Sequence, residues 1–161
     1  MKKQPKTNAM RILERKNIPY VPHEYETGDE ALDGISVAKK TGKDPSDVFK
    51  TLVTKGVSGA VLVFCVPVAR ELDLKKAARA AGEKSVAMLP LPQITPLTGY
   101  VRGGCSPVGM KKAYPTFVDE SAQGRLSVMI SGGRIGLQVE VSPENLVKVA
   151  DAEWASLCVE K

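Results

Sequence analysis

Three separate stretches of the sequence carry residue types that together could hold an acyl or phosphate group. Lys50 follows residues 44–49, which we expect to form a short capped helix that leads into an apolar strand. A lysine at such a junction can bind an anion or polarise a carbonyl group. Two glycine-rich turns lie far downstream, at 101–107 and 131–136. Because glycine lets backbone N–H groups approach a ligand closely, the lysine and the two turns predict one shared binding site.

Few other residues could act as a nucleophile, a base or a metal ligand. The one histidine, His23, lies in an extended segment and is expected to be a half-exposed strand residue. Cys65, Cys105 and Cys158 lie far apart without a Cys-x-x-Cys pair, so neither a disulfide framework nor a four-ligand zinc site is expected. Cys105 follows two glycines in an expected loop, and a nucleophilic thiol there is an alternative mechanism. We expect no metal and no cofactor.

The composition fits one compact globular domain over residues 1–161. Of these 161 residues, 43% are hydrophobic and 25% are charged, which is enough apolar content for one core. No apolar run approaches the roughly 20 residues that span a bilayer. The basic start of the chain does not lead into an apolar signal core. We therefore expect a cytoplasmic protein with no membrane partner.

The charge has the sign that nucleic acid favours. The net charge is +5, and basic residues cluster at 39–43, 75–79 and 111–112. Each cluster alone is typical of a solvated face, but together they would allow an RNA end to dock. With only three Phe and one Trp, the chain does not indicate a base-stacking platform.

Helix and strand signals alternate along the chain, and these elements must position the lysine and the turns. Helices are expected at about 7–16 with Thr7 as N-cap, at 36–41 before Gly42, at 72–81, and from Ser142 onward. Strands are expected at 20–25, 50–55, 60–66, 116–119, 127–130 and 136–141.

The expected strands differ in their surroundings. Residues 50–55 and 60–66 should form a hairpin of central strands, because both arms are rich in Val and Leu. Residues 136–141 alternate apolar and polar side chains, which is typical of a strand with one wet face. Residues 89–96 contain three prolines and form either a short helix or a loop. Together these elements predict an α+β fold with a mixed, largely antiparallel sheet.

Four motifs in a fixed order resemble those of the YbaK/EbsC family. They are Phe49-Lys50-Thr51-Leu52 and residues 72–77, 98–109 and 131–137. The resemblance runs from the first helix to about Val149. It implies a freestanding relative of the editing domain that is inserted in bacterial prolyl-tRNA synthetases. The closest branch resembles the Cys-tRNA(Pro)/Cys-tRNA(Cys) deacylases.

The resemblance implies a curved, barrel-like mixed sheet surrounded by helices, with a pocket between the strand of Lys50 and the two glycine-rich turns. The implied catalytic residues are Lys50, Gly103 and Gly104. The implied substrate-binding residues are Tyr25, Thr98, Ser131, Gly132 and Gly133. Tyr25 matches a tyrosine that lines the pocket in the family, whereas a purely structural role is an equal alternative for Thr98.

The implied reaction cleaves the ester that joins cysteine to the 3′-terminal ribose of tRNA(Pro). The backbone N–H groups of Gly103 and Gly104 would form an oxyanion hole. Lys50 would neutralise terminal phosphate or ribose oxygens and hold the ester, with a role as base for a lysine of lowered pKa as the alternative. Since no strong nucleophile is evident in the chain, the resemblance implies that the cysteinyl thiol of the substrate attacks its own ester.

The implied partner is charged tRNA, Cys-tRNA(Pro). The basic clusters can bind phosphates of any RNA sequence and so do not select one tRNA. Prolyl-tRNA synthetase is therefore the expected partner for tRNA selection. Two alternatives stay open: an Ala-tRNA(Pro) deacylase of the same superfamily, and a non-catalytic module that binds tRNA or a synthetase.

Overall fold

The strands of the computed structural model, which describes residues 5–27 and 32–160, form two sheets. The smaller sheet is antiparallel, in the order β1-β7-β6: β1 (Val21–Glu24), β7 (Leu137–Val141) and β6 (Val128–Ser131). The larger sheet has the order β4-β2-β3-β5-β8: β4 (Val86–Met88), β2 (Phe49–Gly56), β3 (Val61–Pro67), β5 (Thr116–Asp119) and β8 (Ala152–Ala155). In this sheet β5 runs parallel to both β3 and β8, and the remaining pairs are antiparallel.

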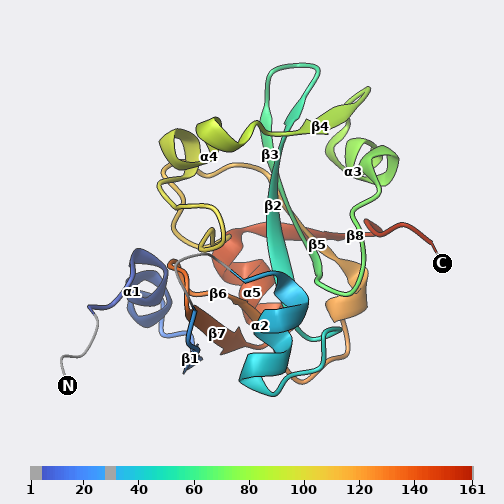
Figure 1. Cartoon of the computed structure of the whole chain (residues 1–161). Helices are drawn as coiled ribbons and strands as arrows, with labels where there is room; N and C mark the ends of the chain where they lie inside the picture. The colour runs from blue at the N-terminus through green and yellow to red at the C-terminus, as the bar shows by residue number, and fades with distance from the viewer. Residues whose placement is uncertain (1–4, 28–31, 161) are drawn as a thin grey trace.

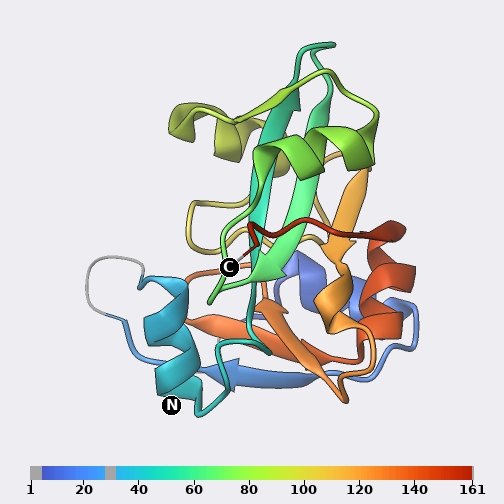
Figure 2. The same cartoon turned by 90° about the vertical axis from the view of Figure 1, so that its right-hand side faces the viewer.

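In the described part of the chain five α-helices flank the sheets (Figures 1 and 2). They are α1 (Asn8–Arg15), α2 (Gly34–Thr41), α3 (Leu74–Ala81), α4 (Leu91–Thr98) and α5 (Pro143–Ala150), with a 3-10 turn at Glu120–Ala122. In Figure 1, α3 and α4 lie beside the tall β2–β3 hairpin, whereas α1 and α2 lie lower, near the smaller sheet. No helix within residues 5–27 and 32–160 has the length and apolar character needed to cross a membrane.

The helices begin and end at the capping residues of the sequence. Thr7 and Ser142 accept hydrogen bonds from backbone N–H groups at the starts of α1 and α5, as expected. Gly42 ends α2 in the left-handed conformation, with φ of 72°. Asp73 supplies the same kind of N-cap for α3, so that helix begins two residues later than its apolar pattern indicated.

The strand β3 is buried on both faces, as its apolar composition predicted, whereas β2 is buried only in part, because Lys50, Thr51 and Leu52 are half-buried and Lys55 is exposed. Cys65 of β3 packs in a core cluster that joins α1, α5 and the smaller sheet. Phe64, its neighbour, points to the opposite side and packs in a second cluster beneath α3. There its ring stacks on Phe117, with the centroids 5.4 Å apart. Core packing on both sides of β3 therefore fixes the position of the hairpin that carries Lys50.

The expected α+β fold with mixed, largely antiparallel strands is confirmed, but the strands divide into two sheets and form no closed barrel in the described chain. The two sheets meet at one parallel bridge, between Val48 and Met129. The expected helix at 44–49 is also absent. Residues 44–47 form a turn in which the Asp47 N–H donates to the Asp44 carbonyl at 2.8 Å, and the bridge at Val48 then draws the chain into an extended conformation.

The strand β7 lacks the wet face that its alternation indicated. It is the central strand of its sheet, and Val139 packs in the first core cluster. On the other face α2 covers the sheet through a cluster of Ala38, Val48 and Met129. Gln138 on that face is consequently only 6% exposed.

Candidate active site

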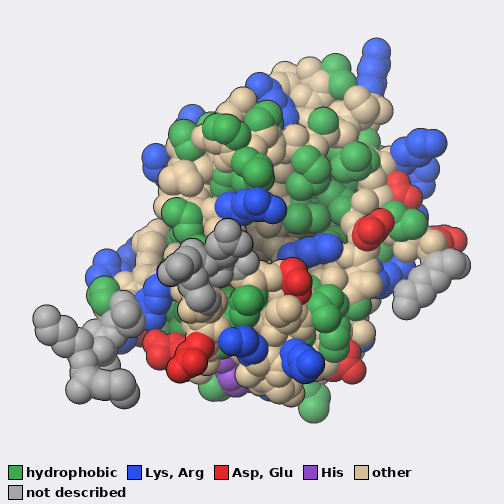
Figure 3. All heavy atoms as spheres, viewed as in Figure 1, with side chains coloured by type: hydrophobic (Ala, Val, Ile, Leu, Met, Phe, Trp, Pro, Cys, Tyr) green, Lys and Arg blue, Asp and Glu red, His purple; other side chains and the backbone are tan. Residues whose placement is uncertain are grey.

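A cavity of about 510 Å³ lies between β2, α2 and the segment that leads into α4. This volume is in the range of small-molecule sites. Its described lining residues are Tyr25, Leu32, Gly34, Val37, Val48–Val53, Val68, Met88–Leu91, Ile94, Arg102, Gly103, Cys105, Ser131 and Gln138. Figure 3 shows a hollow on this face with hydrophobic side chains gathered around it and basic groups at its edge.

The edge of β2 is open along this cavity. Met129 N–H donates to the Asp47 carbonyl at one end, and Leu89 N–H donates to the Val53 carbonyl at the other. The strand β4 pairs with β2 only at residues 54–56. The backbone of Thr51, which faces away from β3, therefore has no strand partner on the cavity side within residues 5–27 and 32–160. An N–H and a C=O in this position are available to a ligand.

Two cations line the cavity. Lys50 is half-buried on β2, and Arg102 lies exposed at the mouth. Neither forms an ion pair with a carboxylate of the described residues, and no described lining residue is an Asp or Glu. The cavity therefore carries a positive potential that suits an anionic ligand or a developing oxyanion.

The two glycine-rich turns meet, although they are distant in the sequence. A Cβ on Gly104 would lie 2.8 Å from the carbonyl carbon of Arg134, so only glycine permits this contact. Gly103, with φ of 86°, lines the cavity, as does Ser131 at the start of the other turn. Lys50, Gly103 and Ser131 thus line the same cavity, and their roles in a shared site stay predictions.

Three of the predicted glycines have other positions and partners. Gly104 donates its N–H to the Val101 carbonyl at 3.0 Å, and Gly132 donates to the Leu137 carbonyl at 2.9 Å. Gly133 donates to the Ser131 hydroxyl at 3.1 Å. None of the three is among the lining residues. These N–H groups form hydrogen bonds within the turns. Of the Gly103–Gly104 pair, only Gly103 therefore lines the cavity.

Thr98 lies away from the cavity wall. Its side chain is fully buried, and its hydroxyl donates to the Ile94 carbonyl at 2.7 Å and accepts from the Tyr100 N–H at 3.1 Å. These contacts end α4 and start the following turn. The structural alternative therefore fits Thr98, whereas Tyr25 lines the cavity as expected.

The alternative nucleophile, Cys105, lines the cavity but is a poor source of thiolate. Burial raises the pKa of the Cys105 thiol to about 11, so the thiol is protonated near neutral pH. His23, the only histidine of the chain, is not a lining residue. It lies on β1, where its Nε2 is 2.9 Å from Glu140 Oε1. The structure thus forms no cysteine–histidine pair.

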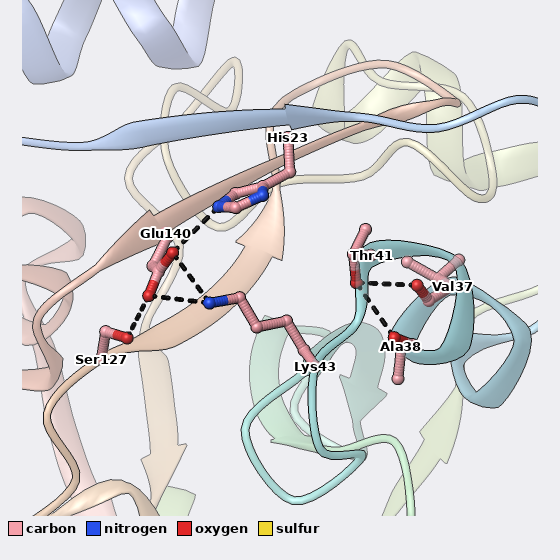
Figure 4. A network of polar contacts seen from close by, with 7 residues as sticks. All are labelled: His23, Val37, Ala38, Thr41, Lys43, Ser127 and Glu140. Carbon is pink, nitrogen blue, oxygen red and sulfur yellow. Dashed lines mark hydrogen bonds and ion pairs between the residues drawn. The ribbon is translucent and has the colours of Figure 1, made fainter.

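His23 belongs instead to a polar cluster around Glu140, shown in Figure 4. The Glu140 carboxylate also contacts Lys43 Nζ at 3.1 Å and accepts a hydrogen bond from the Ser127 hydroxyl. The Ser127 hydrogen bond, followed by His23 and Lys43, lowers the pKa of Glu140 to about 2 against an opposing effect of burial. Because Lys43 follows α2, this cluster holds α2 against the smaller sheet and so fixes one wall of the cavity.

Sequence reasoning missed Arg102, Gln138 and the open edge at Thr51. Arg102 precedes Gly103 directly, and a cation beside a glycine pair is a signal that could have found it. Gln138 was taken as a residue of a wet strand face. The open edge depends on strand pairing, which no local pattern contains.

Three comparisons place the chain among known proteins. A family model described as an aminoacyl-tRNA editing domain matches residues 30–149. A curated protein of Enterococcus faecalis (strain ATCC 700802 / V583), named "Putative Cys-tRNA(Pro)/Cys-tRNA(Cys) deacylase EbsC", is 42% identical over 156 residues. That match covers 97% of this chain and 95% of the relative.

Solved structures agree in fold. A structure described as "a putative trans-editing enzyme for prolyl tRNA synthetase" is 25% identical with a TM-score of 0.82, and the match covers 98% of this chain and 100% of the other. The structure of a hypothetical protein, 23% identical, superimposes with a TM-score of 0.86 over 95% of this chain and 100% of the other. The chain therefore belongs to the aminoacyl-tRNA editing domain family, a family of aminoacyl-tRNA deacylases, within which it resembles the YbaK/EbsC proteins as its motifs predicted.

Proposed function

We propose that the chain is a trans-editing deacylase that removes cysteine from Cys-tRNA(Pro), with Cys-tRNA(Cys) as a second substrate. In this proposal residues 1–161 form one editing domain that acts in the cytoplasm. The observation that carries it is the cavity in which Lys50 and Gly103 lie together without a carboxylate among the described lining residues. The 42% identity to the E. faecalis relative supports the same substrates.

The proposed chemistry relies on charge stabilisation. Negative charge grows on the ester carbonyl oxygen when the ester is attacked, and donors fixed in a cavity stabilise that charge far better than water does. The Gly103 N–H and the Lys50 ammonium are the donors that we assign to this role. Arg102 at the mouth lies where the phosphate of the terminal nucleotide would enter. Each group acts by position and charge alone.

The proposed nucleophile is the thiol of the substrate. Its sulfur bonds to the carbonyl carbon of the same cysteinyl group, the bond from that carbon to the ribose oxygen breaks, and the thiol proton passes to the ribose oxygen. The products are tRNA with a free ribose hydroxyl and a small cyclic thioester, which water then hydrolyses. The raised pKa of Cys105 and the distant position of His23 support this route, since they leave the enzyme without an activated nucleophile.

We further propose that prolyl-tRNA synthetase assists tRNA selection. The basic clusters at 39–43, 75–79 and 111–112 supply contacts to phosphates, which bind without reading the base sequence. A synthetase that already holds tRNA(Pro) would supply the missing selectivity. Addition of the synthetase should then raise the preference for Cys-tRNA(Pro) over Cys-tRNA(Cys).

The proposed function is tested by deacylation of a panel of charged tRNAs. Purified protein is mixed with Cys-tRNA(Pro), Cys-tRNA(Cys), Ala-tRNA(Pro) and Ser-tRNA, with Lys50→Ala as the inactive control. We expect rapid loss of cysteine and slow loss of alanine and serine, because the last two lack the thiol. Faster release of alanine would instead assign an Ala-tRNA(Pro) deacylase. Tight tRNA binding without cleavage at any protein concentration would assign a non-catalytic module.

A further inference from the structure

The cavity contains a buried amide whose hydrogen bonds are incomplete. Gln138 lines the cavity and is 6% exposed, and its Oε1 has no hydrogen-bond partner among the described residues. Buried polar groups are normally paired, because an unpaired acceptor loses its hydration without compensation. An amide of this kind in a cavity wall is a candidate for contact with a ligand.

The neighbours of Gln138 do not complete its hydrogen bonds. Its cross-strand partners in the sheet are Ser131 on β6 and His23 on β1. The Ser131 hydroxyl accepts a hydrogen bond from the Gly133 N–H, and His23 is paired with Glu140. Neither Ser131 nor His23 donates to the Gln138 oxygen in the described structure.

The substrate of the proposed reaction carries a positive group that the cavity must also accommodate. The α-ammonium of an aminoacyl ester needs hydrogen-bond acceptors, yet the described lining residues supply two cations and no carboxylate. Neutral acceptors must fill this role. A carboxylate there would pair with Lys50 or Arg102 and weaken the potential that stabilises the oxyanion. A neutral amide oxygen accepts from the ammonium and leaves that potential intact.

We propose that Gln138 is a specificity-determining residue whose carboxamide oxygen accepts a hydrogen bond from the α-ammonium of the bound aminoacyl group. The inference rests on the proposed deacylase function. The Oε1 atom is itself covered in the structure, but the two ends of the amide are nearly equal in size, so rotation about the terminal bond exchanges it with the nitrogen and presents the oxygen to a cationic ligand. With the carbonyl held at Lys50 and Gly103, the ammonium is directed toward the wall that β7 forms.

The test removes the proposed hydrogen bond in two ways, first by deleting the α-amino group of the substrate and then by replacing the amide of Gln138. Two substrates are compared, Cys-tRNA(Pro) and 3-mercaptopropionyl-tRNA(Pro), which keeps the thiol but has hydrogen in place of the α-amino group. Single-turnover cleavage rates are divided by the uncatalysed rate of each ester, because the ammonium also makes an ester intrinsically more reactive. The enzymes are the wild type, Gln138→Met, Gln138→Glu and, as a matched control at an exposed site, Gln123→Met.

We expect the wild type and Gln123→Met to favour the cysteinyl substrate by about tenfold or more, as for a hydrogen bond to a charged group. Gln138→Met should reduce this ratio to near one by slowing only the cysteinyl substrate. Gln138→Glu should preserve the ratio, since it keeps an acceptor oxygen, while it slows both substrates, because its charge weakens the positive potential of the cavity. Thermal unfolding of each variant checks that the fold is retained.

The outcomes separate this inference from the function on which it rests. If the wild type cleaves neither ester, the deacylase function itself is wrong. If the wild type cleaves both at equal corrected rates, the ammonium is not recognised and the inference fails whatever the variants do. Equal slowing of both substrates by Gln138→Met would reduce Gln138 to a structural residue. Loss of the ratio in Gln138→Glu would show that the amide acts as a donor.

Discussion

Gln138 and Glu140 lie two residues apart on the same face of β7. They differ in charge and in the number of hydrogen-bond partners of their side-chain oxygens. The Glu140 carboxylate contacts Ser127, His23 and Lys43, so its charge is neutralised within the fold (Figure 4). The Gln138 oxygen has no partner among the described residues.

The same contrast holds for the two regions as a whole. Around Glu140, acid and base are matched, and the cluster holds α2 against its sheet. In the cavity, Lys50 and Arg102 have no acidic partner in the described chain, and the Thr51 edge has no neighbouring strand. Paired polar groups stabilise a fold, whereas unpaired ones in a cavity are typical of ligand binding. The comparison predicts that substitutions in the two regions will affect different measurements.

Lys50→Ala should have the largest effect on activity. Removal of the cavity cation should slow cleavage of Cys-tRNA(Pro) by at least about 100-fold, because charge on the ester oxygen would lose its main stabilising group. The thermal unfolding midpoint should stay within about 2 °C of the wild type, since no described ion pair is lost. Single-turnover kinetics and calorimetry measure the two effects. If Lys50→Ala stayed active, the proposed division between a catalytic cavity and a structural cluster around Glu140 would fail.

Glu140→Gln should show the opposite behaviour. Loss of the paired carboxylate should lower the free energy of unfolding by about 1–3 kcal/mol, as for a broken, partly buried network. Activity at 25 °C should fall far less than in Lys50→Ala, because Glu140 does not line the cavity and acts on it only through the position of α2. Urea denaturation gives the stability. Glu24→Gln, at an exposed ion pair with Arg134, is the matched control and should cost less than about 1 kcal/mol.

The pH dependence sharpens the assignment of Glu140. Its pKa is about 2 in the fold against an ordinary value of 4.5. A lowered pKa means that this carboxylate stabilises the fold fully above about pH 4.5 and progressively less as the pH falls toward 2. The stability difference between wild type and Glu140→Gln should therefore shrink between pH 5 and pH 3. A difference that stays constant over this range would show that the network does not depend on the charge.

Cys105→Ala should have the smallest effect. The Cys105 thiol is protonated near neutral pH, so its loss should change the cleavage rate by no more than about threefold. The rate is measured beside that of Lys50→Ala with the same Cys-tRNA(Pro) preparation. Comparable losses in the two variants would point to catalysis by the enzyme thiol and against attack by the substrate.

The local features of the fold were predictable because they depend on neighbouring residues. Thr7 and Ser142 cap helices by contacts within one turn, and Gly42 ends a helix because it adopts a positive φ. The β2–β3 hairpin follows from two apolar runs around one turn. Lys50 and Gly103 were assigned to one site because several motifs occur in a fixed order, and both residues line the same cavity.

The features that failed depend on long-range pairing. The division into two sheets rests on the Val48–Met129 bridge between segments far apart in the chain. The burial of Gln138 depends on α2, which covers a face that local alternation marks as wet. The strands β4 and β8 are too short to show a periodic pattern in the sequence. The N–H groups of Gly104 and Gly132 were assigned to a ligand, but each donates to a backbone carbonyl that the sequence does not reveal.

The open edge at Thr51 also bears on self-association. An unpaired strand edge is normally a template on which a second chain can add and begin to aggregate. Here the exposed stretch lies inside a concavity and is closed at Val48 by β6 and at Val53 by the segment before α4. The stretch between these two closures is too short for a second strand to pair along it, whereas a small ligand needs only one N–H and one C=O. The open edge of β2 is thus suited to a small ligand and not to pairing with another β-strand.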